Sequence, residues 1–109
     1  MENALAALID ESFHDHLQLV EIEYTVRECA VLAGIPLDVR RETLALVRAL
    51  IVEHGLIPGE FAAVDGGFTF VAWDVPIKCV LDRIDSEWSA LGRELNLGDV
   101  VWLTRPERL

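Results

Sequence analysis

Residues 73–92 constrain the fold most, because this stretch carries signals for both ends of a single helix. Asp74 is placed to cap the N-terminus, Pro76 suits the first turn, and Gly92 suits the left-handed conformation that ends a helix. Apolar side chains recur at helical spacing on one face: Ile77, Val80, Leu81, Ile84, Trp88 and Leu91. We therefore predict one amphipathic helix, with Trp88 as its main anchor in the core.

Three helical patterns precede this stretch. Residues 2–11 form a short one, and residues 38–54 carry a clear apolar stripe. Residues 13–33 are ambiguous, because a helical stripe overlaps residues 22–26, which alternate like a strand and contain strand-forming side chains. The length of the run and its end at Gly34 favour a helix.

Other residues mark where the earlier helices begin and end. Ser12 is placed to cap the helix that follows it, and Asp38 to cap the helix over 38–54, which Gly55 ends. Leu56 to Gly59 contain a Pro-Gly pair, which predicts a turn rather than a strand.

The C-terminal half also contains strand signals. Asp65-Gly66-Gly67 is a tight-turn sequence between the apolar runs 60–64 and 68–73, and residues 100–104 form a last apolar run. We expect the last strand to pair with residues 68–73, and Trp73, Trp88 and Trp102 to meet where the sheet joins the helix. The predicted fold class is α+β and mostly α: three to four helices with a small antiparallel β-hairpin or sheet near the C-terminus.

Length and composition predict one domain over residues 1–109. The chain is 52% hydrophobic, which is enough for a core without metal or disulfides. No apolar run approaches a membrane span, and the start lacks the positive charge of a secretion signal, so we expect a cytoplasmic protein. Cys29 and Cys79 each lie among apolar neighbours in a helical pattern and are interpreted as small buried hydrophobic residues.

The charge is strongly negative and unevenly distributed. The formal net charge is −10, and residues 1–28 hold seven acidic side chains against Arg27 alone, a net −6. Residues 55–75 add Glu60, Asp65 and Asp74 with no base. Direct binding to nucleic-acid phosphates is therefore disfavoured, and a basic protein partner would relieve the repulsion among these acids.

No motif predicts catalysis or a cofactor. His14-Asp15-His16 resembles a metal or acid–base fragment, but side chains two apart on a helix diverge, and His54 is the only other histidine. No serine lies in a nucleophile elbow, and no glycine run has the spacing of a phosphate cradle. We predict a non-enzymatic protein without metal or cofactor.

A helix–turn–helix followed by a hairpin is also typical of winged-helix proteins, which bind DNA. The recognition helix would be residues 38–54, with Arg40, Arg41 and Arg48 on one continuous basic face. The hairpin that would form the wing carries only acids, which is the wrong sign for phosphate contact. This alternative therefore depends on whether the three arginines share a face.

The C-terminal half resembles a group of uncharacterised small acidic bacterial proteins. The resemblance covers about residues 40–104 and rests on Gly55-Leu56-Ile57-Pro58-Gly59, Gly67-Phe68, Trp73-Asp74, Glu87-Trp88, Leu91-Gly92-Arg93, Gly98-Asp99 and Trp102. Some similar helix-plus-hairpin proteins are immunity proteins of contact-dependent or polymorphic toxin systems. The resemblance implies such a role here, but its glycines and tryptophans mark turns and packing, so it carries over no functional residue.

We predict an acidic protein-binding module, in the first place an immunity protein that covers the basic active-site surface of a toxin. A self-associating module, as a homodimer, is the further alternative. The acidic segments and their aromatic neighbours supply the predicted partner-binding residues: Glu21, Glu23, Tyr24, Glu28, Glu60, Phe61 and Asp65.

Overall fold

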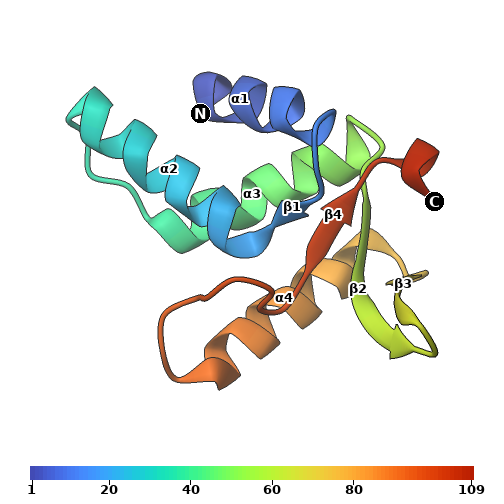
Figure 1. Ribbon diagram of the computed structural model, residues 1–109. Helices are drawn as coiled ribbons and strands as arrows, with labels where there is room; N and C mark the ends of the chain where they lie inside the picture. Colours follow the sequence, from blue (N-terminus) through green and yellow to red (C-terminus); the bar gives the residue numbers. More distant parts are fainter.

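The last strand of the chain lies inside the sheet, between strands from the N-terminal and middle parts of the sequence (Figure 1). The computed structural model describes all residues from 1 to 109 and confirms the α+β fold class. Its elements are α1 (Glu2–Ser12), β1 (Leu17–Gln18), α2 (Leu19–Ala33), α3 (Val39–Val52), β2 (Ile57–Val64), β3 (Gly67–Ala72), α4 (Ile77–Leu91), β4 (Trp102–Thr104) and the 3₁₀ helix η1 (Pro106–Arg108).

The ambiguous N-terminal segment is helical from Leu19 to Ala33, as the longer pattern predicted. The prediction was wrong at its start, because Leu17 and Gln18 form a short strand instead. Gln18 then caps α2 in a capping box, in which its backbone N–H donates to Glu21 Oε1 at 3.0 Å. Ser12 is not a cap, because it ends α1 and its hydroxyl donates to the Ile9 carbonyl.

The expected start of α3 and the expected end of α4 are confirmed, but α3 ends at Val52 with Glu53 as its C-cap, before the predicted end at Gly55. Asp38 caps α3 by accepting a hydrogen bond from the Arg41 backbone, and Gly92 ends α4 with φ 63°. Asp74 does not cap α4, because the residue before the helix is Pro76, in an extended conformation and without a side-chain cap. The helix consequently begins at Ile77, with no first-turn position left for the proline.

The sheet has the strand order β1-β4-β2-β3, and all neighbouring strands are antiparallel. The expected pairing of the last strand with residues 68–73 is wrong: β4 pairs with Ile57 to Gly59 on one side and with β1 on the other. The predicted turn at Pro58-Gly59 is also wrong, because β2 runs through it. Pro58 fits the strand because it lies beyond the last β2–β3 pair, Gly59 with Ala72, where no N–H is needed for that ladder. Its carbonyl accepts a hydrogen bond from the Trp73 backbone at 2.9 Å.

The core contains side chains from all four helices and from the neighbouring strands β1 and β4. Its largest fully buried members include Leu17, Leu19, Ile22, Leu50, Leu56, Ile84 and Leu103. The apolar stripe of α4 faces this core, with Val80, Ile84 and Trp88 buried. Leu103 of β4 pairs with Leu17, which ties the C-terminal strand to the N-terminal helices.

The three tryptophans do not meet, contrary to the prediction. Each ring has its own partner: the Arg83 guanidinium lies 3.8 Å from the Trp73 ring, and that of Arg40 lies 4.7 Å from the Trp88 ring. Trp102 instead lies edge-to-face with Phe61 at 5.1 Å between centroids. Arginine stacking therefore replaces the expected aromatic cluster at the helix–sheet junction.

The sequence also predicted that both cysteines are buried. Both cysteines are free, but Cys79 is exposed on α4 and Cys29 only partly buried, so the expectation of two buried cysteines is wrong. Position 79 falls beside the buried stripe rather than in it.

None of the helices is both long enough and apolar enough to cross a bilayer.

Candidate partner-binding groove

A groove of about 440 Å³ lies between α1 and the start of α2. We call it the α1–α2 groove; its lining residues are Ala7, Leu8, Glu11, Leu17, Val20, Glu21, Tyr24 and Thr25. Leu8 and Leu17 are buried and form an apolar floor, whereas Tyr24 remains 64% exposed at the rim. The groove therefore combines apolar surface with an aromatic side chain that a partner can cover.

The charged side chains of the groove are both acidic. Glu11 and Glu21 line it, and neither forms an ion pair with a lysine, arginine or histidine. One oxygen of Glu21 caps α2, and this hydrogen bond leaves the negative charge in place. Residues 1–26 contain no lysine or arginine at all, so no base of this segment neutralises the groove.

The structure brings some of the predicted α2 residues together. Glu21, Tyr24 and Glu28 are three and four positions apart, so they follow one side of the helix. Glu21 and Tyr24 line the groove itself, and Glu28 is exposed one turn further on. Glu23 lies on another side of α2, where it pairs with Arg27 at 3.5 Å. Its charge is therefore partly neutralised within the helix.

The predicted hairpin residues lie elsewhere. Figure 1 shows the β2–β3 hairpin and the C-terminal half of α2 on opposite sides of the molecule. Glu60 accepts hydrogen bonds from Arg83 at 3.2 Å and from the Trp73 indole at 3.3 Å, so its carboxylate is already used within the chain. Phe61 packs against Phe70, His16 and Trp102, while Asp65 is exposed in the hairpin turn.

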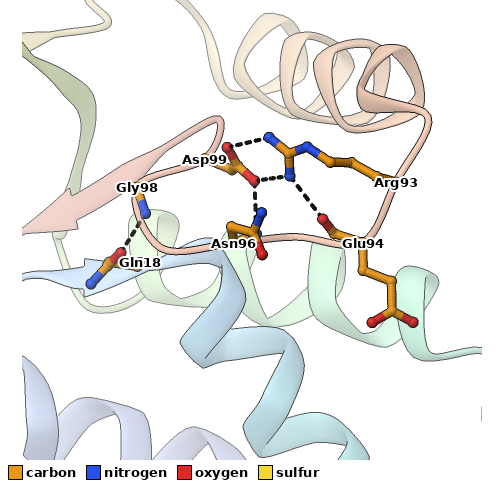
Figure 2. Close-up of polar contacts among 6 residues, drawn as sticks. All are labelled: Gln18, Arg93, Glu94, Asn96, Gly98 and Asp99. Atoms are coloured by element: carbon orange, nitrogen blue, oxygen red, sulfur yellow. Dashed lines mark hydrogen bonds and ion pairs between the residues drawn. The ribbon is translucent and has the colours of Figure 1, made fainter.

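A hydrogen-bonded loop after α4 contacts Gln18 of β1 (Figure 2). The Gly98 N–H donates to the Gln18 side chain at 2.6 Å, and the backbone N–H of Gln18 donates to Glu21. Asp99 closes the loop by accepting two hydrogen bonds from Arg93 and one from the Asn96 backbone. The adjacent Val100 is held at φ 68°, a conformation that is strained for a β-branched residue.

Arg93 lowers the pKa of Asp99 in this loop. Its hydrogen bonds hold the pKa of Asp99 below the usual range, with the Asn96 N–H as a second contribution. A lowered folded-state pKa stabilises the fold at pH values above the ordinary aspartate pKa, and this stabilisation disappears as the pH falls through the lowered value.

We expect Arg93→Gln to raise the Asp99 pKa towards its usual range, as measured by NMR titration of its carboxyl carbon. Arg48→Gln is the control, because Arg48 is an exposed arginine on α3. An unchanged Asp99 titration in Arg93→Gln would contradict this assignment.

The two histidines of His14-Asp15-His16 have different surroundings. His14 is exposed, and no group of three or more His, Cys, Asp or Glu side chains has the arrangement of a metal centre. His16 contacts the Thr104 hydroxyl at 2.7 Å and packs against Phe61 and Phe70. His16 directly precedes β1, and its ring packs against aromatic side chains of the sheet.

The three arginines of α3 do not share one continuous face. Arg40 forms an ion pair with Asp85 at 2.8 Å, donates to Ser89, and covers the Trp88 ring, so it fastens α3 to α4. Arg41 and Arg48 are exposed and seven residues apart, hence on one side of the helix. The condition for a winged-helix DNA-binding face is therefore not met.

Comparisons with protein-family models, with curated proteins and with solved structures found no match.

Glu11 and Leu17 line the groove but were not among the predicted site residues. Glu11 was counted only as part of the acidic segment, although it lies four residues after Ala7, on the same side of α1. Leu17 was assigned to a helix, whereas the strand it forms places its side chain in the groove floor. The strand residues Leu17 and Gln18 gave no signal of their own, because two residues are too few for a periodicity.

Proposed function

We propose that the protein binds a basic protein partner through the α1–α2 groove and blocks it, as an immunity protein blocks its toxin. The observation that carries the proposal is the pair of glutamates, Glu11 and Glu21, beside an apolar floor, without a neutralising base. An apolar partner side chain flanked by lysine or arginine would fit this groove.

The charge distribution favours rapid capture of such a partner. A surface with one sign of charge steers an oppositely charged protein towards it and raises the association rate. Toxin domains that act on nucleic acids need cationic active sites, and an acidic groove that covers such a site would exclude the substrate. Tyr24 is the aromatic anchor of this surface, because it is exposed at the rim and loses little conformational entropy when it is covered.

The test uses the double variant Glu11→Gln/Glu21→Gln and the product of the gene beside this one. Glutamine at position 21 can still accept the Gln18 hydrogen bond, so the helix cap is kept while the charge is lost. We expect the association rate constant, measured by biolayer interferometry at low salt, to fall by about 3- to 10-fold, with a weaker dependence on salt.

Asp65→Asn is the matched control, because it also removes a charge, keeps a favourable hairpin turn, and lies on the hairpin instead of the groove. This variant should bind at nearly the wild-type rate. Equal association rates for the double variant and the wild type would overturn the groove as the binding site. Absence of any binding or protection from toxicity by the wild-type protein would overturn the immunity role.

A further inference from the structure

Strand β3 is an open edge of the sheet. It lies at the end of the strand order and is hydrogen-bonded to β2 alone. Its six residues, Gly67–Ala72, include no charged residue and no proline, the usual devices that keep an edge from pairing with another strand. All of them except Phe70 are exposed, and Phe68 is 74% exposed.

The hairpin register determines which backbone N–H and carbonyl groups of β3 are not hydrogen-bonded to β2. Val64 pairs with Gly67 across the two-residue loop, so the pairs of Thr69 and Val71 with β2 are also hydrogen-bonded. The Trp73 N–H, two residues further, donates to Pro58 in agreement with this alternation. The N–H and carbonyl groups of Phe68, Phe70 and Ala72 consequently point towards the open edge.

We propose that two copies of the chain associate through β3, antiparallel and centred on Phe70, to form one sheet that continues through both copies. In this register Phe70 lies opposite Phe70 of the second copy, and Phe68 lies opposite Ala72, a large side chain beside a small one. Thr69 lies opposite Val71. The pairing adds about six backbone hydrogen bonds and brings no charged residues of the two strands face to face.

The opposite edge of the sheet limits the association to two copies. That edge is β1, which has only the two residues Leu17 and Gln18. Such a short strand offers too little backbone for further pairing, so the contact closes as a two-fold dimer and does not extend into a filament. The α1–α2 groove is not part of this interface, and the proposal does not depend on the proposed function.

Charge makes this dimer weak at low salt. The centred register brings Asp74 of one copy near Asp65 of the other, and each chain carries a formal net charge of −10. Salt screens this repulsion, so dimerisation should strengthen as salt is added. Binding of a basic partner to the groove should show the opposite salt dependence, which keeps the two associations distinguishable.

Sedimentation equilibrium of the full chain from about 5 to 500 μM tests the proposal, since a dissociation constant on the order of 10–100 μM is expected for so small an interface. Ala72→Pro removes an edge-facing N–H and should leave the protein monomeric. Ala63→Pro is the matched control, in the same hairpin. The N–H of Ala63 faces away from β3, and no strand pairs with it on that side because β4 pairs only with residues 57–59 of β2. The Ala63→Pro variant should therefore dimerise like the wild type.

Hydrogen exchange of the wild-type protein gives a second measurement that needs no variant. The amides of Phe68, Phe70 and Ala72 should become protected as the protein concentration rises, while the Asp65 amide at the turn should not. A wild-type protein that stays monomeric at 500 μM and about 0.5 M salt, with fast exchange at these three amides, would overturn the proposal. Capture of a foreign strand at this edge by a monomeric protein would also overturn it, in favour of a different occupant.

Discussion

Trp88→Ala should lower the free energy of unfolding by about 3–5 kcal/mol, the range for removing a large aromatic side chain from a core. Trp88 is only 8% exposed and belongs to the buried stripe of α4. The substitution leaves a cavity between α4 and its neighbours and also removes the ring that the Arg40 guanidinium covers. Urea unfolding followed by circular dichroism measures the loss.

Leu97→Ala is the control for this measurement. Leu97 is 78% exposed in the loop after α4, so its truncation should change stability by about 0.5 kcal/mol or less. If Trp88→Ala cost less than about 1 kcal/mol, the packing of α4 described above would be wrong.

Gly59→Ala should cost about 2–3 kcal/mol, at the upper end for overpacking a well-packed site. A Cβ atom at Gly59 would lie 2.4 Å from the Val71 carbonyl oxygen and 2.6 Å from the Phe70 ring. The ring can turn, but the carbonyl belongs to the paired strand β3, so the substitution must push β2 and β3 apart. Thermal and urea unfolding of the variant measure the cost.

Gly55→Ala separates this effect from the general cost of replacing a glycine. Gly55 has φ 72°, and a Cβ atom there would have open space around it, so only the backbone conformation resists the change. We expect a cost of about 1 kcal/mol. A smaller loss for Gly59→Ala than for Gly55→Ala would show that the approach of β3 to β2 is not as close as described.

The helices were predictable because each repeats its pattern over several turns. Leu19, Ile22 and Val26 give the same spacing that the structure buries, and Gly34 marks the end where the chain turns left-handed. The order of the strands was not predictable in this way. The apolar run at 100–104 indicates a buried strand but contains nothing that chooses between β2 and β3 as its neighbour, so the wrong partner was expected.

The candidate site was predictable in part, for a related reason. Charge counting identifies acidic segments without regard to their partners, and the structure shows that Glu60 and Glu23 already contact Arg83 and Arg27. Glu21 and Tyr24 lie together because the helix spacing between them is local. Glu11 joins them only through the packing of α1 on α2, a contact that no short motif encodes.

The position of β4 makes one short strand the link between the N-terminal part of the sheet and the hairpin. Trp102 to Thr104 fill the gap between β1 and β2, and β1 has no other strand beside it. Without β4, Leu17 would lack the strand that it pairs with, and β2 would have an open edge on the side away from β3. The floor of the groove therefore depends on a strand that contributes none of its lining residues.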